Sequence, residues 1–264
     1  MRVIVESTAA QVAQKAATFV ADLVRSKPTC VLGLATGSTP LGLYRELIRL
    51  HKEEGLDFSR VTSFNLDEYV GLAPTHDQSY RYFMQTNLFD HINIDQRNTY
   101  VPDGLTDDFD FACAKYERQI KEEGGIDLQV LGIGTDGHIA FNEPGSSLGS
   151  RTRLKSLTSE TVQDNARFFG TIEEVPRLAV TMGVGTILES QRCLLLACGQ
   201  HKSEAIRATI EGPITAQVTA SALQLHRDVI CVIDEDAASR LVRRSYYCEV
   251  EQAQQALQAR KRKK

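Results

Sequence analysis

The sequence predicts one α/β domain, built as a doubly wound, mostly parallel sheet flanked by helices. Short apolar runs alternate with longer amphipathic segments along most of the chain, which is the order typical of a parallel sheet covered by helices. The apolar runs are nearly continuous, as expected of strands that are buried on both faces. No repeat or linker divides residues 1–264, so we expect a single domain with a frayed basic tail from about residue 258.

The apolar runs define the expected strands, and the segments with apolar residues every three or four positions define the expected helices. The expected strands are Cys30–Ala35, Val61–Asn65, Ile126–Ile133, Arg177–Thr181, Cys193–Ala197 and Val229–Ile233. The expected helices are Ala9–Arg25, Leu41–Glu54, Tyr80–Phe89, Phe109–Glu123, Lys202–Ile210 and Ala237–Val242. The second of these helices follows Pro40, a residue that the first turn of a helix accepts.

Composition indicates a reduced, cytoplasmic enzyme. Hydrophobic residues make up 42% of the chain and charged residues 24%, which is ordinary for a globular enzyme. The net charge of -4 argues against nucleic acid as a partner. No apolar run approaches the ~20 residues that cross a membrane, and no signal-peptide core is visible. The six cysteines are dispersed without a C-x-x-C pair, so neither a disulfide framework nor a zinc site is expected.

The stretch from Leu131 to Pro144, LGIGTDGHIAFNEP, predicts an acid–base site. It places Asp136, His138 and Glu143 on a glycine-rich turn directly after an expected strand. Open α/β sheets bind their ligands where strands end, and histidine titrates near neutral pH. Either carboxylate could orient the imidazole and raise its basicity. The alternative is a purely structural cluster.

The same glycines also match the G-x-G-x-x-G pattern of dinucleotide-binding folds. That pattern requires a helix to begin at once, so that its first N–H groups hold a pyrophosphate. Here Glu143-Pro144-Gly145 follows within a turn or two, and this sequence rarely continues a helix. We therefore expect no nicotinamide cofactor.

A second polar loop, Ala35-Thr36-Gly37-Ser38-Thr39-Pro40, predicts an anion site for a sugar phosphate. Its hydroxyls and glycine precede a helix, whose first N–H groups are exposed. The alternative is simple capping of that helix by Ser38 or Thr39. Arg167 and Lys202 are candidate cations for the same anion, and the alternative for each is a solvated surface charge.

A third polar loop, Phe64-Asn65-Leu66-Asp67-Glu68-Tyr69-Val70-Gly71, offers a catalytic carboxylate. Asp67 and Glu68 are adjacent, so we expect one to enter the cleft while the other meets solvent or a cation. By itself this block could be a turn with a helix cap. Beside two other polar loops at strand ends, a catalytic carboxylate explains it better.

With these blocks in order, nearly the whole chain resembles the glucosamine-6-phosphate deaminase family. The resemblance rests on the three blocks above and on Ser150-Arg151-Thr152-Arg153. It implies a doubly wound α/β fold and conversion of glucosamine 6-phosphate and water to fructose 6-phosphate and ammonia, in amino-sugar catabolism.

The resemblance also implies residue roles. His138 would open the sugar ring, with Asp136 and Glu143 orienting it, and Asp67 would move the C2 proton to C1. The substrate phosphate would bind Gly37, Ser38, Thr39, Arg167 and Lys202. No metal or organic cofactor is implied, because the substrate's own nitrogen stabilises the intermediate.

Many members of the family are hexamers activated by N-acetylglucosamine 6-phosphate at a site between subunits. The positions that match this allosteric site are Ser146, Arg153, Lys155, Ser156 and a tyrosine, either Tyr246 or Tyr247. Position 156 is often threonine in related chains, and the C-terminal segment departs from the family pattern.

Two other functions compete with deamination. A 6-phosphogluconolactonase-like hydrolase would share the fold and the phosphate loop, but it needs no counterpart of Asp67. A catalytically silent sugar-phosphate sensor would be expected to have lost one of the four acid–base residues or to carry a DNA-binding segment. All four residues are present and no segment is spare, so deamination is favoured.

Overall fold

The structure is a computed structural model that describes residues 1–262, and its centre is a seven-stranded parallel sheet. From one edge to the other, the strands are β1 (Arg2–Glu6), β10 (Val229–Asp234), β9 (Cys193–Ala197), β6 (Leu128–Leu131), β2 (Val31–Leu34), β3 (Thr62–Asn65) and β5 (Thr99–Tyr100). Each neighbouring pair is parallel. This confirms the predicted fold class.

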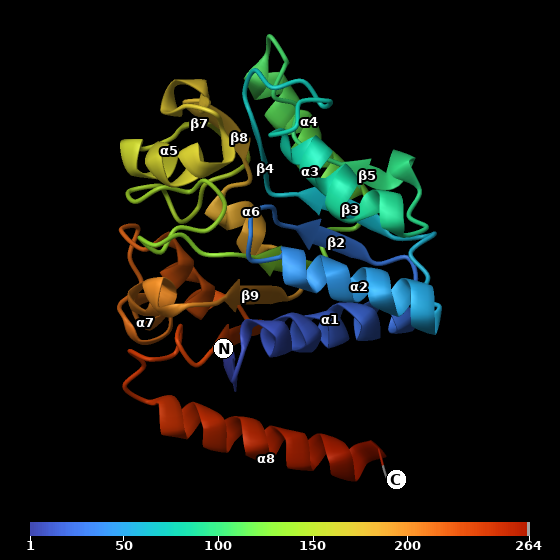
Figure 1. The fold of residues 1–264 in the computed structure, drawn as a ribbon, viewed down its shortest axis with the longest axis vertical. Helices are drawn as coiled ribbons and strands as arrows, with labels where there is room; N and C mark the ends of the chain where they lie inside the picture. The colour runs from blue at the N-terminus through green and yellow to red at the C-terminus, as the bar shows by residue number, and fades with distance from the viewer. Residues whose placement is uncertain (263–264) are drawn as a thin grey trace.

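Helices cover both faces of this sheet (Figure 1). They are α1 (Ala9–Ser26), α2 (Leu41–Glu54), α3 (Tyr80–Asn87), α4 (Phe109–Glu122), α5 (Ser159–Asn165), α6 (Val184–Leu188), α7 (Ser203–Glu211) and α8 (Arg244–Arg262). Short 3-10 helices lie at η1 (Phe89–His91), η2 (Gln96–Asn98), η3 (Ala166–Phe168), η4 (Ile172–Glu174), η5 (Gln200–Lys202) and η6 (Thr219–Leu225). None of the described helices is both long enough and apolar enough to cross a membrane.

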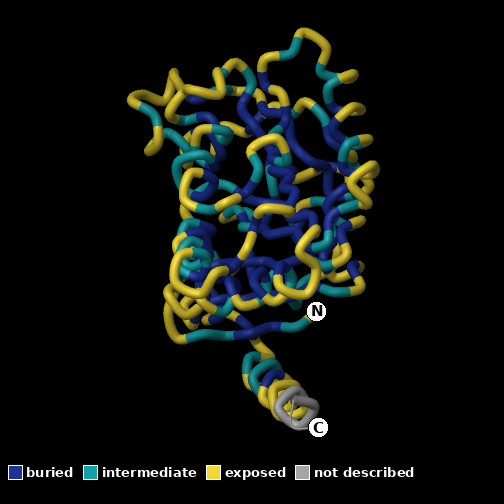
Figure 2. The backbone as a smooth tube through the Cα atoms, turned by 90° about the vertical axis from the view of Figure 1, so that its right-hand side faces the viewer, coloured by how far each residue is buried: buried dark blue, intermediate teal, exposed yellow. Residues whose placement is uncertain are grey.

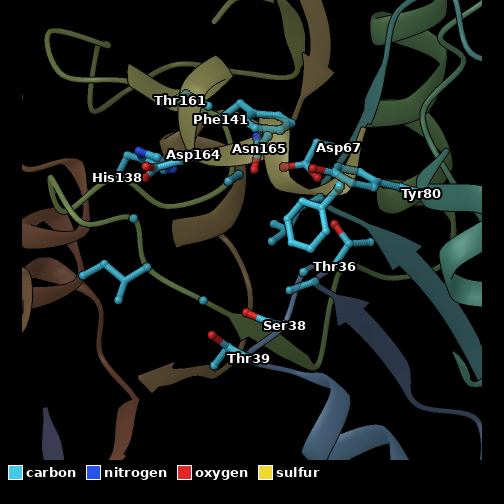
Figure 3. A pocket seen from close by; sticks show the side chains of 18 of the residues that line it. Thr36, Ser38, Thr39, Asp67, Tyr80, His138, Phe141, Thr161, Asp164 and Asn165 are labelled. Carbon is cyan, nitrogen blue, oxygen red and sulfur yellow. The ribbon is translucent and has the colours of Figure 1, made fainter. Parts of the chain in front are cut away.

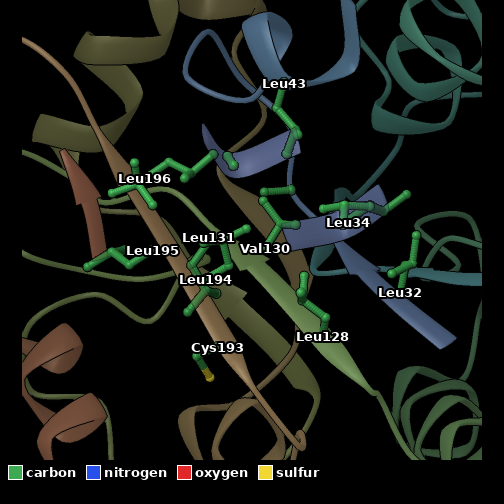
Figure 4. Packing of buried hydrophobic residues seen from close by; sticks show 14 of the residues in the cluster. Leu32, Leu34, Leu43, Leu128, Val130, Leu131, Cys193, Leu194, Leu195 and Leu196 are labelled. Carbon is green, nitrogen blue, oxygen red and sulfur yellow. The ribbon is translucent and has the colours of Figure 1, made fainter. Parts of the chain in front are cut away.

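The core forms between the helices and the central strands, whose apolar side chains point to both faces (Figure 4). In β9, Cys193, Leu194, Leu195 and Leu196 are all buried, which explains the continuous apolar run in the sequence. Helix α1 starts where Thr8 accepts a hydrogen bond from the Gln11 backbone N–H at 3.2 Å. It lies beside α2, and its buried face is rich in alanine, which allows close packing.

A second, three-stranded antiparallel sheet sits beyond one end of the central sheet, in the order β4 (Asp67–Tyr69), β8 (Leu178–Thr181) and β7 (Arg153–Ser156). The strand predicted at Arg177–Thr181 is therefore real, but it belongs to this sheet. Leu66 joins the two sheets, because its N–H donates to Leu34 O at 3.1 Å and its carbonyl accepts from Met182 N–H at 2.7 Å. Asp67 thus follows the point where the chain passes from one sheet to the other.

The C-terminal part of the chain differs most from expectation. The helix predicted at Ala237–Val242 is wrong: this segment is a turn, in which the Asp234 carboxylate accepts the Ala237 N–H at 2.8 Å. Helix α8 follows instead and lies along the edge strand β1, where Arg2 forms two bonds of 2.7 Å with Glu251. Most of α8 is exposed (Figure 2). Fraying from about residue 258 remains a prediction, because the side chains of 258–264 lie outside the described part.

The order of the strands creates one topological switch point. From β2 the chain runs outward to β3 and β5, and it then returns to β6 on the opposite side of β2. The loops that follow β2 and β6 therefore diverge at the carboxyl ends of two adjacent strands, where open α/β sheets bind ligands. These are the two loops that carry the predicted phosphate site and the predicted histidine.

Candidate active site

A cavity of about 180 Å³ opens at the switch point. It brings together the predicted residues Gly37, Ser38, Thr39, Asp67, His138, Arg167 and Lys202. Figure 3 shows how Ser38 and Thr39 approach it from the loop after β2, while Asp67 and His138 approach from other elements. Asp136 and Glu143 do not line it and lie behind His138.

The backbone of the loop after β6 fixes His138. Gly134 N–H donates to His138 O at 2.9 Å, and a Cβ at Gly134 would lie 2.5 Å from the imidazole ring. Gly137 has φ +88, a conformation that side chains rarely adopt. The backbone then runs from 132 to 152 without a helix, so the G-x-G-x-x-G pattern here is not a dinucleotide-binding turn.

Two carboxylates face the same imidazole nitrogen. His138 Nδ1 lies 2.7 Å from Asp136 Oδ1 and 3.7 Å from Glu143 Oε2, although the first contact lacks the alignment of a regular hydrogen bond. Burial raises the pKa of Asp136, but the side-chain and backbone N–H groups of His138 outweigh burial and lower it. Asp136 is thus a carboxylate that favours a proton on Nδ1. The three ligand atoms lie within 4.8 Å of one another, close enough to hold a cation as well.

Asp67 is a buried acid that faces the cavity. It is 6% exposed, and no described residue donates a hydrogen bond to its carboxyl group. Burial, and then the neighbouring charge of Glu68, raise the pKa of Asp67 to about 8. A carboxyl group with such a pKa can both accept and return a proton near neutral pH.

The expectation for Glu68 was wrong in part. We expected it to meet solvent or a cation. It is 4% exposed, so it does not meet solvent; its carboxylate accepts hydrogen bonds from three backbone N–H groups, and the positive charge of Arg81 acts on it. Adjacent residues on a strand point to opposite faces, so Glu68 turns away from the cavity that Asp67 faces.

The hydroxyls of the loop after β2 do not cap helix α2. Pro40 is the N-cap of α2, and no side chain caps the helix, so the hydroxyls of Ser38 and Thr39 remain available to the cavity. Gly37 has φ +95. The Arg167 guanidinium lies 4.7 Å from the centre of the Phe168 ring. Burial lowers the pKa of Lys202, as does Arg167, while Asp164 opposes the shift.

Several lining residues were not predicted: Thr36, Tyr80, Phe141, Thr161, Asp164, Asn165 and Phe168. Phe141 and Tyr80 stack with ring centres 6.1 Å apart and form a wall beside Asp67 (Figure 3). Thr161, Asp164 and Asn165 lie on α5, a short helix whose sequence resembles any exposed polar segment. Thr36 and Phe141 lie in two of the polar blocks that the sequence singled out, and Asn165 and Phe168 flank the candidate cation Arg167.

The five positions matched to the allosteric site do not form one cluster within the chain. Arg153 and Lys155 share a face of β7, and Arg153 donates to Asn142 Oδ1 at 2.9 Å. Ser146 is buried, and its hydroxyl has no partner among the described residues. Ser156 ends β7 and is exposed. Tyr246 is 57% exposed on α8, at the other end of the molecule (Figure 1).

A cavity at the switch point of an α/β sheet, lined by two acid–base groups, two cationic side chains and several hydroxyls, is the kind of site found in acid–base enzymes that act on small polar substrates. Residues 5–231 match the family described as glucosamine-6-phosphate isomerases/6-phosphogluconolactonase, and the chain belongs to this family. Relatives named glucosamine-6-phosphate deaminase occur in Shewanella woodyi, 54% identical over 98% of both chains, and in Clostridium perfringens strain SM101, 52% identical over 91% of this chain and all of that protein.

Solved structures agree. A monomeric glucosamine-6-phosphate deaminase superposes with a TM-score of 0.89 at 47% identity, covering 90% of this chain and 99% of that one. A 6-phosphogluconolactonase from Leishmania guyanensis reaches a TM-score of 0.71 at 19% identity, covering 90% of this chain and 98% of that one, which shows a shared fold alone.

Proposed function

We propose that this protein converts glucosamine 6-phosphate and water to fructose 6-phosphate and ammonia. The observation that carries the proposal is that His138 and Asp67, two acid–base groups from different elements, line one cavity with the phosphate-binding residues. A lactonase has no use for a second proton carrier, and the deaminases are far closer in sequence than the lactonases are.

The phosphate anchors the substrate at one end of the cavity. Gly37, Ser38 and Thr39 offer backbone N–H groups and hydroxyls, while Arg167 and Lys202 supply positive charge. Burial lowers the pKa of Lys202, and a phosphate dianion bound there would oppose that shift. The sugar then extends toward His138 and Asp67.

His138 opens the ring. It takes the proton of the anomeric hydroxyl and returns one to the ring oxygen, which leaves an aldehyde at C1. Asp136, ionised beside Nδ1, stabilises the imidazolium that forms between these transfers. Glu143 completes the orientation from 3.7 Å.

Asp67 then removes the C2 proton and gives an enolamine. The same carboxyl group returns the proton to C1, which produces a C2 imine next to a hydroxymethyl group. Water adds to C2, ammonia leaves, and the ketone of fructose 6-phosphate remains. The pKa of Asp67, about 8, suits a group that must accept and donate the same proton.

The test is to incubate the purified protein with glucosamine 6-phosphate and measure ammonia and fructose 6-phosphate together. Equal release of both is expected, and Asp67→Asn should lower kcat by about 100- to 10,000-fold. Asp57→Asn, on an exposed turn, is the matched control and should retain full activity. Hydrolysis of 6-phosphogluconolactone without ammonia release would favour the lactonase, and ligand binding without turnover would favour the sensor.

The proposal also covers where the protein works, how it assembles and how it is regulated: we propose a cytoplasmic, oligomeric and allosteric enzyme. We expect a hexamer activated by N-acetylglucosamine 6-phosphate, because a site that joins Arg153 and Lys155 with Tyr246 must span two copies of the chain. Arg153→Ala should abolish activation and leave unactivated turnover unchanged. A monomer by light scattering, as the name of the 47% identical relative describes, together with no activation, would overturn this part.

A further inference from the structure

We propose that Glu68 is a positioning residue for the reaction: the start of α3 holds it as a buried anion, and from there it makes Asp67 a proton carrier. The inference rests on the proposed function, in which Asp67 moves a proton between C2 and C1. Its evidence is the set of contacts around Glu68, a residue with no place of its own in the reaction.

The N-terminus of α3 binds the Glu68 carboxylate. Oε1 accepts the N–H groups of Tyr69 and Tyr80, and Oε2 accepts the N–H of Arg81, each at 2.9 Å. Tyr80 and Arg81 are the first two residues of α3, whose N–H groups have no partner within the helix. Burial raises the pKa of Glu68, while the three N–H donors, the positive end of the helix and the charge of Arg81 oppose that shift and favour the ionised form.

Asp67 has the opposite surroundings. No described residue donates a hydrogen bond to its carboxyl group, which is buried apart from the face toward the cavity. A second negative charge beside Glu68 is therefore unfavourable. When environments separate two neighbouring carboxyl groups in this way, one remains ionised and the other exchanges a proton.

The other groups that face this pair are accounted for. The phenols of Tyr69, Tyr80 and Tyr116 face Asp67, and burial raises the pKa of each, so they stay neutral. Arg81 faces Glu68, but its guanidinium donates to the side chain and the carbonyl of Thr99 at 2.8 Å each. Among the described residues, Glu68 is the carboxylate whose charge acts on Asp67.

Glu68 also places a wall of the cavity. By fixing the Tyr80 N–H, it closes the loop between β4 and α3 and sets the Tyr80 ring 4.9 Å from that of Tyr69. That wall shields Asp67 from water, and this burial raises the pKa of Asp67 just as the charge of Glu68 does. One side chain thus controls both causes of the elevated pKa of Asp67.

The test compares Glu68→Gln with Ser79→Ala. Gln removes the charge and keeps the size. Ser79 accepts the Tyr82 N–H at 3.1 Å at the same helix start, so its loss weakens α3 and leaves the charge in place. The titration of Asp67 is followed by ¹³C NMR of the substrate-free protein, with Asp67→Asn for assignment, and the acid limb of kcat/KM is measured in parallel.

In Glu68→Gln, the midpoint of the Asp67 titration and the midpoint of the acid limb of kcat/KM should both move down by about one pH unit. This shift raises the ionised fraction of Asp67 at neutral pH about fivefold. In Ser79→Ala, both should stay in place. An unchanged Asp67 midpoint in Glu68→Gln overturns the inference. A midpoint that moves while the kcat/KM limb does not overturns instead the role of Asp67 in the proposed reaction.

The unsubstituted protein gives an independent test if Glu68→Gln does not fold. The Glu68 carboxyl should remain ionised throughout the range in which Asp67 titrates. A Glu68 midpoint above that of Asp67 would overturn the inference.

Discussion

Asp67→Asn should stabilise the protein at neutral pH, because the wild-type residue is a buried acid whose ionisation is unfavourable. Burial and Glu68 raise its pKa to about 8, whereas in the unfolded chain it titrates near ~3.9. Between these values the folded state binds one proton more than the unfolded state does. Stability therefore falls as pH rises through this window, and the full penalty is present above the folded pKa.

A difference of one bound proton changes the free energy of unfolding by about 1.4 kcal/mol per pH unit. The free energy of unfolding of wild type should therefore fall by about 3 kcal/mol, through Asp67, between about pH 5 and about pH 7.5. Asparagine has no proton to lose. The advantage of Asp67→Asn over wild type should therefore grow by that amount across the interval, or by roughly 6–12 °C in Tm. Comparing two pH values cancels the difference in packing between the two side chains.

The assay is thermal or urea unfolding of wild type, Asp67→Asn and Asp57→Asn at both pH values. The Ser59 N–H and the Asn93 side chain lower the pKa of Asp57, so it is ionised at both. Its variant should differ from wild type by the same amount at each pH. An advantage of Asp67→Asn that is equal at the two pH values would refute a high pKa for Asp67.

Three further predictions concern the loop after β6, the anion site and the C-terminal helix. Gly134→Ala should lower kcat at least tenfold, because its Cβ would lie 2.5 Å from the His138 ring; wild-type turnover would contradict the geometry. Lys202→Gln should raise KM for the phosphorylated sugar by about tenfold or more, as loss of a charged hydrogen bond does, and an unchanged KM would remove Lys202 from the anion site. Arg2→Ala should increase hydrogen exchange in α8 through loss of both bonds to Glu251, with kcat unaffected, and unchanged exchange would show that other contacts hold the helix.

Much of the central sheet could be predicted because its inner strands are buried on both faces, which leaves a continuous apolar run in the sequence. Runs such as that of β9 are apolar without alternation, which only burial on both faces explains. The run that forms β8 has the same appearance, yet it pairs with β4 and β7. Its partners are three or four residues long and carry polar side chains, so no local pattern reveals the second sheet.

In the C-terminal part, the sequence predicted a helix where the structure has a turn and did not predict helix α8. Ala237 and Ala238 are good helix formers and are buried, and Asp234 accepts the Ala237 N–H as a helix cap would, yet the segment stays a series of turns. Helix α8 has few apolar residues and a weak periodicity, and its docking depends on Arg2 at the far end of the chain. A contact between residues 249 positions apart leaves no trace in a local sequence window.

The loops of the candidate site could be predicted from the sequence, but the contacts that other elements make with those loops could not. Asp136, His138 and Glu143 come from one short block, so their proximity follows from sequence distance. The proposed role of Glu68 depends on two N–H groups of α3, twelve and thirteen residues away, and could not be predicted from the block itself.

The arrangement of the two sheets predicts that the phosphate of the proposed substrate contributes to catalysis as well as to binding. Asp67 is on β4 and Arg167 lies between β7 and β8, so both belong to the small sheet and its connections. His138 and Lys202 follow β6 and β9 of the central sheet. If Arg167 and Lys202 hold the substrate phosphate as proposed, that phosphate joins these two layers and sets the position of Asp67 relative to His138.

Binding energy from the phosphate is then used in the chemical steps and not only in binding. Glucosamine without its phosphate should consequently show a lower kcat as well as a higher KM. Inorganic phosphate or phosphite added at high concentration should restore part of kcat by occupying the anion site. A phosphate-free sugar with normal kcat and only a raised KM would show that the layers are positioned before substrate binds.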